Sequence, residues 1–220
     1  MQGGACGAQI YGRSCYGRHV STLPPGQFNG HKFVIYTING VPAVREEDYV
    51  FDIFGEVDRP LSLKLGEIRE LATDMMKRDF HCVTRWSIRD CEWKGVPFAL
   101  LSRRAGVKIT AGFAYAHCLD GYTTVMPLEN MADAMLAISL NGSPLRPEQG
   151  APVRLVVPSL YGWKSAKWVR AIEMLGEYRD GYWEERGYHE RGDFLEEERF
   201  KDPSARFIRK KVAKKQTVDP

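Results

Sequence analysis

The sequence predicts a mixed α+β fold around one hydrophobic core, and three observations support this prediction. The 220 residues are 44% hydrophobic and 27% charged, as in ordinary globular domains. The chain contains 21 glycines, 5 tryptophans and 10 tyrosines, a bias that favours strands joined by tight turns. Short strand-like runs alternate with short helical repeats, and no internal sequence repeat is found.

The first half of the chain predicts mainly strands. Residues 1–32 show little pattern, apart from a rigid turn at Pro24-Pro25-Gly26. Apolar residues recur at helical spacing over 65–76, which predicts a helix there. Alternating or β-branched runs predict strands at 33–38, 49–54 and 60–63, and a strand with a loop at 80–88.

The second half predicts strands mixed with short helices. Pro97 and Gly106 bound a predicted helix over 97–105. The pattern over 169–175 fits a strand or a short helix and does not decide between them. Further strands are expected at 113–117, 122–127, 137–140 and 153–157, with a helical turn at 128–134. From Asp193 onward the chain is rich in Glu, Lys and Arg, which predicts a solvated extension.

Charge and hydropathy exclude several classes of partner. The net charge is +3, from 31 basic and 28 acidic residues, which is too small to indicate nucleic acid or an anionic membrane as a partner. No apolar run approaches the ~20 residues of a membrane span. Residues 1–16 contain neither a hydrophobic signal core nor a twin-arginine pair, so we expect a cytoplasmic protein, or a periplasmic one if a signal has been removed.

The cysteines do not form a disulfide or zinc pattern. Their number is odd and no Cys-x-x-Cys pair occurs, which argues against a disulfide framework and against a zinc ribbon. We therefore expect reduced thiols, most of them small buried apolar groups. The five are Cys6, Cys15, Cys82, Cys91 and Cys118.

One cysteine lies in a setting that indicates chemistry. Residues 81–87 read His-Cys-Val-Thr-Arg-Trp-Ser, so that Cys82 is flanked by histidine and arginine. Such neighbours favour the thiolate, which acts as a nucleophile or as a soft metal ligand. The alternative interpretation is a strand cysteine beside unrelated surface charges.

Two further runs indicate an anionic ligand. Arg154 lies in the apolar run 153–157, where its charge is costly unless it meets an anion or carboxylate, or turns toward water. Its planar fork suits a phosphate. Residues 161–168 read Tyr-Gly-Trp-Lys-Ser-Ala-Lys-Trp, and their lysines and serine can hydrogen-bond an anion, although a basic turn has the same composition.

Other classes of site lack their motifs. The chain has no Gly-x-x-x-x-Gly-Lys-Ser/Thr loop, no Gly-x-Gly-x-x-Gly after a strand and no Gly-x-Ser-x-Gly elbow. These absences argue against P-loop, dinucleotide-binding and Ser-His-Asp chemistry. A cysteine hydrolase that pairs Cys82 with His117 or His189 stays open.

Seven short motifs follow one another through residues 24–195. They read Pro-Pro-Gly-Gln with Lys-Phe-Val-Ile-Tyr, Phe-Gly-Glu-Val-Asp-Arg-Pro-Leu, His-Cys-Val-Thr-Arg-Trp-Ser, Trp-x-Gly-Val-Pro, Asp-Gly-Tyr-Thr-Thr, Gly-Ala-Pro-Val-Arg-Leu-Val-Val-Pro and Tyr-Gly-Trp-Lys-Ser-Ala-Lys-Trp. In this order they resemble the molybdopterin-binding catalytic domain of the sulfite oxidase family, in particular its short prokaryotic members without a haem domain.

The resemblance implies a mixed α+β domain around a buried pterin that carries a phosphate. In that family the molybdenum is held by two dithiolene sulfurs of the pterin and by one protein cysteine. The expected division is a lead over 1–23, a molybdopterin-binding oxidoreductase domain over 24–195 and a charged tail over 196–220. The implied cofactor is molybdopterin with molybdenum.

The resemblance also implies roles for particular residues. Cys82 would be the molybdenum ligand, and Tyr122 and Arg85 would complete the catalytic set. Arg85 would orient an oxyanion substrate, whereas Trp86 would narrow the site and exclude charged substrates. The residues implied to hold the pterin and its phosphate are His31, Cys118, Gln149, Arg154, Lys164, Ser165, Ala166 and Lys167.

The expected reaction is two-electron oxygen-atom transfer on a small sulfur-containing substrate such as sulfite. Reduction of sulfoxides or N-oxides is the alternative reaction, and a molybdopterin-binding protein without turnover is the alternative of another class. A chain of 220 residues has no room for the family's haem or immunoglobulin-like domains. The resemblance therefore implies a separate electron-transfer protein, either a cytochrome or a membrane redox subunit.

Overall fold

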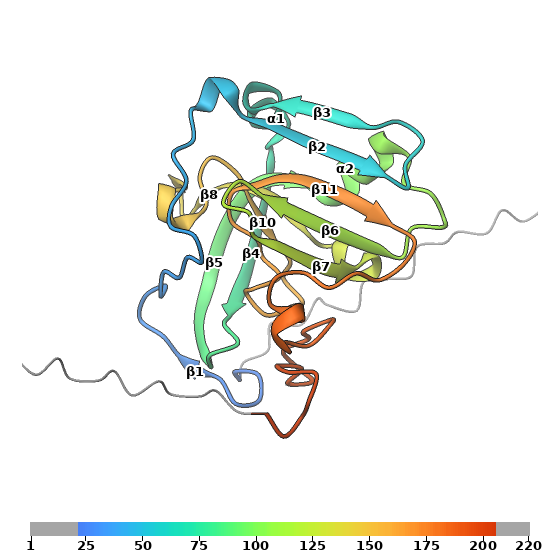
Figure 1. Cartoon of the computed structure of the whole chain (residues 1–220). Coiled ribbons are helices and arrows are strands. Elements are labelled where there is room, and N and C mark those ends of the chain that lie inside the picture. The colour runs from blue at the N-terminus through green and yellow to red at the C-terminus, as the bar shows by residue number, and fades with distance from the viewer. Residues whose placement is uncertain (1–21, 206–220) are drawn as a thin grey trace, which may run out of the picture.

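Two β-sheets share one hydrophobic core in the computed structural model, which describes residues 22–205 (Figure 1). Within these residues the first sheet has six strands, with β1 (Phe28–Asn29), β5 (Trp86–Pro97), β8 (Met135–Leu140) and β10 (Arg154–Val156) in order, β4 (Asp74–His81) beside β5, and β9 (Ser143–Pro144) beside β8. The second sheet has the order β3 (Leu61–Lys64), β2 (Val50–Gly55), β11 (Val169–Leu175), β6 (Phe113–Cys118) and β7 (Thr123–Pro127).

The helices are short and lie at the ends of strands. Helix α1 (Leu65–Leu71) connects β3 to β4, and α2 (Phe98–Ala105) follows β5. Gly106 adopts a left-handed φ of 63° at the end of α2, where a glycine carries no Cβ penalty. Single 3-10 turns occupy Glu46–Asp48, Leu128–Met131, Pro147–Gln149 and Glu184–Arg186.

The core lies between the two sheets. Phe51 and Ile53 of β2 and Ile172 of β11 are fully buried, and they belong to the same hydrophobic cluster as Leu136 of β8 and Leu155 of β10. This arrangement confirms the predicted mixed fold. Strand β11 pairs in parallel with β2 and antiparallel with β6, so the ambiguous run 169–175 is a strand because it has partners on both sides.

Most of the other predicted elements are confirmed, but two are wrong. Residues 33–38 are not a strand, because their backbone pairs with no strand and crosses the mouth of a cavity instead. The helix predicted over 65–76 ends at Leu71, because the chain from Asp74 onward pairs with β5. Strand pairing along this whole stretch outweighs its helical periodicity.

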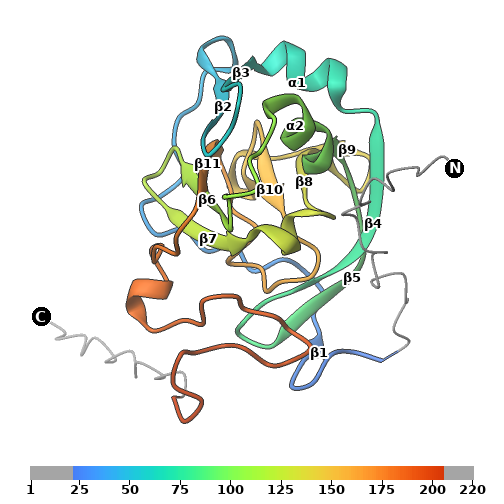
Figure 2. The same cartoon turned by 90° about the vertical axis from the view of Figure 1, so that its right-hand side faces the viewer.

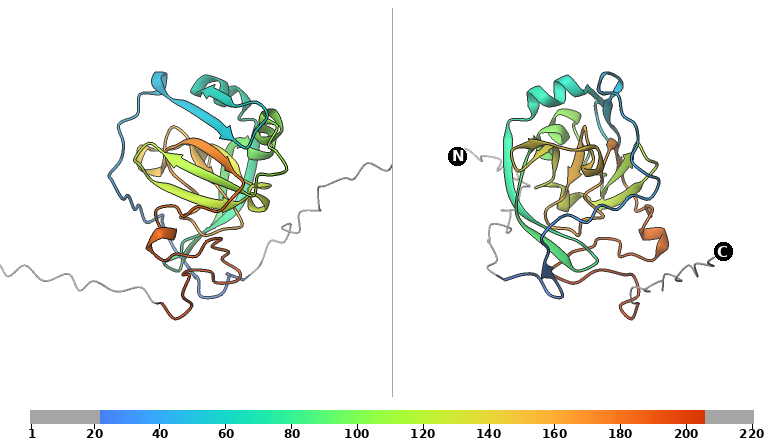
Figure 3. Two further views of the ribbon diagram at one scale, coloured as in Figure 1. Left: turned by 45° about the vertical axis from the view of Figure 1, so that its right-hand side comes forward. Right: turned by 90° about the vertical axis from the view of Figure 1, so that its left-hand side faces the viewer.

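The C-terminal segment also differs from the prediction. Figures 1, 2 and 3 show the orange-to-red segment after β11 returning to the end of the molecule where β1 and the β4–β5 turn lie. Asp193 and Arg199 are buried there, so residues 193–199 are not a solvated extension. Residues 1–21 of the expected lead and 206–220 of the expected tail lie outside the described residues, as do Cys6 and Cys15. The three described cysteines are free thiols, as predicted.

Gly95 marks a position where the fold tolerates no side chain. It pairs with Ala137 of β8 next to an irregularity in the ladder, and a Cβ built on it would lie 2.1 Å from the carbonyl oxygen of Leu136. We expect Gly95→Ala to lower the free energy of unfolding by about 1–3 kcal/mol through overpacking, as measured by urea denaturation.

Gly66 provides the matched control within α1. A Cβ built there meets nothing within 4 Å. Since alanine is the better helix former, Gly66→Ala should raise the free energy of unfolding by up to about 1 kcal/mol. Equal effects of the two substitutions would contradict this account of Gly95.

Candidate functional site

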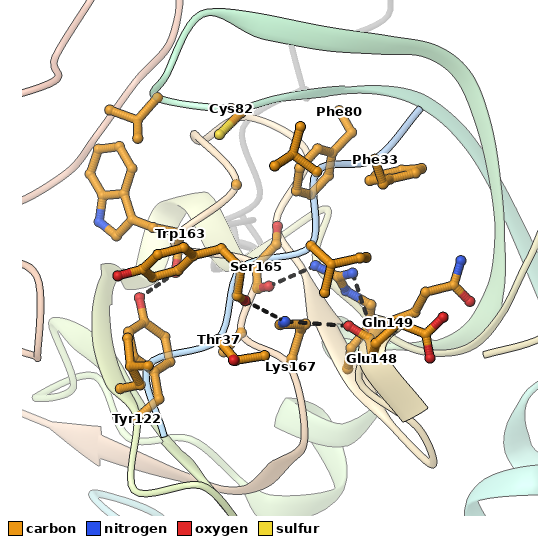
Figure 4. A pocket seen from close by; sticks show the side chains of 18 of the residues that line it. Phe33, Thr37, Phe80, Cys82, Tyr122, Glu148, Gln149, Trp163, Ser165 and Lys167 are labelled. Carbon is orange, nitrogen blue, oxygen red and sulfur yellow. Dashed lines mark hydrogen bonds between the residues drawn. The ribbon is translucent and has the colours of Figure 1, made fainter. Parts of the chain in front are cut away.

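A cavity of about 390 Å³ brings together segments that are distant in the sequence. Its walls come from the loop 33–38, the turn between β4 and β5, the run 162–168 and the turn at Glu148 and Gln149 (Figure 4). The volume lies within the range of small-molecule sites, and most of the wall is aromatic or aliphatic. The volume and the lining are those of a binding site for a small molecule.

Cys82 lies on the tight turn that joins β4 to β5. The Cys82 amide donates to the Trp86 carbonyl at 2.9 Å, and the Arg85 amide donates to the Cys82 carbonyl at 2.9 Å. Arg85 closes the turn with a left-handed φ of 83°. The sulfur lines the cavity and lies 3.2 Å from the Thr84 hydroxyl.

The charges around Cys82 differ from the sequence interpretation. Burial raises the pKa of Cys82 above its ordinary value. Burial also lowers the pKa of His81 to about 4, and its Nδ1 lies 2.8 Å from the Ser87 hydroxyl. In the chain by itself, burial therefore opposes the thiolate that the flanking residues are expected to favour. A cation bound at the sulfur would supply the missing stabilisation.

Arg154 is a buried cation in the cavity wall. Its guanidinium carbon lies 5.5 Å from the centroid of the Phe80 ring and 5.2 Å from that of Trp93. Arg154 donates to the carbonyls of Gln149 at 3.0 Å and Ser165 at 2.9 Å, but its buried Nε has no partner. Burial lowers the pKa of Arg154 to about 10, so it stays charged at neutral pH. Among the described residues no carboxylate pairs with it, so this wall is suited to an anion.

Lys167 adds a second positive charge. Its Nζ donates to the Tyr36 carbonyl at 2.7 Å and lies 4.3 Å from the Trp168 ring centroid. Burial, together with the charge of Arg154, lowers the pKa of Lys167 to about 8. Lys167 therefore ties the loop 33–38 to the same anion-accepting wall.

The remaining predicted residues that line the cavity are Tyr122, Gln149, Ser165 and Ala166. The Tyr122 hydroxyl donates to the Trp163 carbonyl at 2.7 Å, and the Ser165 hydroxyl accepts from the Val157 amide at 3.0 Å. Burial raises the pKa of Tyr122 well above its ordinary value, so its phenol is neutral. Both hydroxyls thus hold the backbone of the wall in place.

Four predicted site residues lie outside the cavity lining. His31 and Arg85 are exposed, and Cys118 is buried in the main core at the end of β6. Lys164 is fully buried, with its Nζ 2.5 Å from Glu184 Oε1. Ser165 lines the cavity but Lys164 does not, and the charge of Lys164 is neutralised in an ion pair.

The cysteine-hydrolase alternative finds no support in the geometry. His117 Nε2 lies 3.0 Å from Glu173 Oε2, on the second sheet. His189 Nδ1 lies 3.4 Å from Glu198 Oε2. In the part of the chain that the structure describes, neither histidine is a hydrogen-bond partner of the Cys82 sulfur, which a Cys-His pair requires.

Several aromatic wall residues were not predicted as site residues. Phe33 and Tyr36 lie on the loop that the β-branched pattern assigned to a strand, and Phe80 packs against Phe33 with ring centroids 5.3 Å apart. Trp183 and Tyr188 come from the segment after β11. The only signal in the sequence was the density of aromatic residues, which does not distinguish a core from a cavity wall.

The donor groups of the cavity are divided between two sides. Figure 4 shows Cys82 and Phe80 on one side and Lys167, Glu148 and Gln149 on the other. Residues 22–205 contain no group of three or more His, Cys, Asp or Glu that could hold a metal ion. A metal bound to Cys82 would therefore need ligands from a non-protein group. A cofactor that carries a soft metal at one end and a phosphate at the other fits this donor set.

Comparison with known proteins identifies such a cofactor. A family model described as the oxidoreductase molybdopterin binding domain matches residues 38–183. The chain belongs to this family. It is a molybdopterin-dependent oxidoreductase with the sulfite oxidase type of fold, and its cofactor is molybdopterin with molybdenum.

Individual relatives cover the family domain to different extents. The chain is 37% identical to an uncharacterized oxidoreductase, YuiH of Bacillus subtilis, over 86% of this chain and 98% of that protein. It is 31% identical to the protein-methionine-sulfoxide reductase catalytic subunit MsrP of Campylobacter jejuni, over 63% of this chain and 52% of that protein. The crystal structure of the sulfane dehydrogenase SoxCD of Paracoccus pantotrophus matches with a TM-score of 0.57 and 27% identity, over 63% of this chain and 41% of that one.

Within residues 22–205, no helix has the length and apolarity needed to cross a membrane.

The lowered pKa of Lys167 predicts how anion binding to the cofactor-free chain depends on pH. Lys167 is charged below about pH 8 and loses its charge above it, whereas sulfate stays a dianion across this range. A bound anion favours the charged lysine, so sulfate binding takes up a proton when the pH exceeds 8. Sulfate affinity, measured by calorimetry, should therefore fall about tenfold from pH 7 to pH 9.

Lys167→Gln is the control for this pH dependence. The variant should bind sulfate more weakly at pH 7, and its affinity should change little up to pH 9. A tenfold fall that persists in the variant would show that another group titrates.

Proposed function

We propose that the chain reduces a small, uncharged sulfoxide by two-electron oxygen-atom transfer, at molybdenum held by Cys82. One observation carries this choice of substrate: among the described residues, the only Arg or Lys side chains in the cavity lining are Arg154 and Lys167, which the cofactor's phosphate would use. Arg85, which would have recognised an oxyanion, is exposed and lies outside the lining, while Trp86 forms part of the wall. A neutral substrate needs no counter-charge, whereas a dianion such as sulfite does.

The geometry supports the following donor groups for the cofactor. Cys82 would supply the protein thiolate to the metal. Arg154, with its unpartnered Nε, and Lys167 would hold the phosphate, and Gln149 would add an amide donor. The aromatic rings of Phe33 and Phe80 offer flat apolar surfaces for the pterin.

The bound cofactor supplies the two-electron redox chemistry, and the protein supplies binding, orientation and exclusion of water. The overall reaction takes one sulfoxide, two protons and two electrons to one thioether and one water. The hydroxyl of Tyr122 already donates to the Trp163 carbonyl, so Tyr122 would orient the wall beside the metal. Trp86 and Tyr188 would restrict the substrate to small or extended groups.

The electrons would come from a separate electron-transfer protein, such as a cytochrome or a membrane redox subunit. The relative MsrP is named a catalytic subunit, and this chain spans about half of its length. This name supports a two-protein system for the present chain as well.

Sulfite oxidation is the second candidate, and one observation favours it. Arg199 lies close enough to Cys82 for its charge to lower the pKa of the thiol, although burial of the thiol has the larger effect. A positive charge at that position would attract sulfite. Arg199 lies outside the cavity lining, however, which makes it the weaker basis for substrate choice.

The two candidates differ in the assays that they predict. The molybdenum-loaded protein should oxidise a reduced viologen dye with methionine sulfoxide, with a kcat/KM at least tenfold above that for sulfite with an oxidised acceptor. Cys82→Ser should lower sulfoxide turnover more than about 100-fold, since loss of even an indirect contact to a metal ligand costs 10–100-fold.

Cys91→Ser is the matched control, because Cys91 is a free thiol buried in another cluster. It should keep turnover within about twofold per molybdenum. Faster sulfite turnover would select the second candidate, and full molybdenum loading without either activity would indicate a non-catalytic binding protein.

Arg154→Met separates cofactor binding from folding. Methionine keeps much of the apolar volume between Phe80 and Trp93 and removes a buried charge, so the free energy of unfolding should be unchanged or higher. The pterin content per chain, measured by fluorescence after oxidative release, should fall at least tenfold. Arg104→Met, at an exposed position of α2, should leave the pterin content unchanged.

A further inference from the structure

Two residues outside the family match hold the backbone of the Cys82 turn. The side-chain amide of Gln27 donates to the Cys82 carbonyl at 3.2 Å, and the guanidinium of Arg199 donates to the next carbonyl, that of Val83. The family match covers residues 38–183, so neither residue belongs to it. The carbonyls of Cys82 and Val83, which are consecutive in the turn, therefore accept hydrogen bonds from residues that lie on either side of the family match in the sequence.

Arg199 is placed by several contacts. It is 6% exposed, and its guanidinium carbon lies 4.8 Å from the Tyr161 ring centroid. A second nitrogen lies 3.5 Å from the Pro25 carbonyl and 3.3 Å from Glu197 Oε1. These contacts use both terminal nitrogens of the guanidinium, while its buried Nε has no partner among the described residues, and together they hold the side chain in one position.

The segment that presents Arg199 is itself held in place. Glu198 accepts from the Arg191 side chain at 2.8 and 2.6 Å and from the Asp193 amide at 2.9 Å. The Phe194 ring contacts the His81 ring, with centroids 4.2 Å apart. The C-terminal segment therefore packs directly against the residue that precedes Cys82.

Gln27 makes the second side-chain contact to the Cys82 turn. Its side-chain oxygen accepts from the Ser87 hydroxyl at 3.0 Å, and that hydroxyl lies 2.8 Å from His81 Nδ1. Gln27 thereby connects the two strand ends that flank the turn. The turn carries exposed residues at Thr84 and Arg85, so these two contacts act on the part that has the least packing of its own.

We propose that Gln27 and Arg199 form a clamp on the Cys82 turn, and that Arg199 is a positioning residue that sets where the Cys82 sulfur lies relative to the metal. This inference rests on the proposed function in one respect, that Cys82 is the metal ligand. The physical basis is that the orientation of the peptide planes after Cys82 determines the direction of its side chain. A misplacement of about 1 Å at a reacting centre can lower a rate about 100-fold.

The test uses the full chain, with and without molybdopterin, and measures the rate at which iodoacetamide alkylates Cys82, followed by peptide mass spectrometry. Arg199→Ala should speed this alkylation at least fivefold in both forms by making the sulfur more accessible, although loss of the Arg199 charge alone would raise the pKa of the thiol and slow the reaction, while Cys91 stays unchanged. In the loaded protein it should also alter the Mo(V) paramagnetic resonance signal and lower kcat at least tenfold, with little change in KM.

Arg199→Lys, Gln27→Leu and Glu197→Gln complete the set. Lysine keeps a donor for the Val83 carbonyl, so it should restore part of the wild-type alkylation rate and signal. Gln27→Leu removes the other contact and should act in the same direction as Arg199→Ala, which keeps the test valid if that variant does not fold. Glu197→Gln removes the half-exposed carboxylate charge that pairs with Arg199, but Arg199 keeps its contact to the Val83 carbonyl. This variant should behave as wild type.

The outcomes separate the clamp from the proposed function. Wild-type alkylation rates and resonance signals in Arg199→Ala and Gln27→Leu would overturn the clamp, whatever their melting temperatures. If wild-type Cys82 reacts equally fast with and without molybdenum, the ligand role of Cys82 fails. The ratio of variant to wild-type rates in the cofactor-free chain then still decides whether the turn is clamped.

Discussion

The site depends on one buried charge, the guanidinium of Arg154. It lies between the rings of Phe80 and Trp93, donates only to backbone carbonyls and keeps an unpartnered Nε. A carboxylate beside Arg154 would have neutralised its charge in an ion pair, as Glu184 neutralises Lys164. Because none is present among the described partners, the cavity keeps a positive potential that an anionic group can satisfy.

The second cation, Lys167, lies with Glu148 and Gln149 on one side of the cavity, and the thiol of Cys82 lies on the other (Figure 4). A cofactor with a phosphate at one end and a soft metal at the other can bind in only one direction across such a site. Under the proposed function its phosphate would use the cations Arg154 and Lys167 and leave the aromatic part of the wall to the substrate. The proposed orientation of the cofactor and the proposed substrate preference therefore rest on the same distribution of charge.

The segments on either side of the family domain contribute to the site as well. The loop 33–38 forms a wall and is tied to Lys167 through the Tyr36 carbonyl. The C-terminal segment brings Tyr188 into the lining and Arg199 onto the Cys82 turn. The backbone of the Cys82 turn is thus held in place by residues that are distant in the sequence. Such supporting contacts are what makes a functional site on a turn rigid.

Sequence patterns alone predict the strands with strict alternation and the helix bounded by Pro97 and Gly106. Motif order predicts the family and places Cys82, Arg154, Ser165 and Lys167 at one site. These follow from local rules and motif order, which do not require knowledge of distant contacts. The folded chain shows what these patterns do not predict. Residues 33–38 line a cavity, Arg85 and His31 are exposed, Cys118 and Lys164 are buried elsewhere, and Arg199 reaches the Cys82 turn. The reason is that a side chain's direction at a turn, and the partner of a buried charge, depend on segments that meet only when the chain is folded.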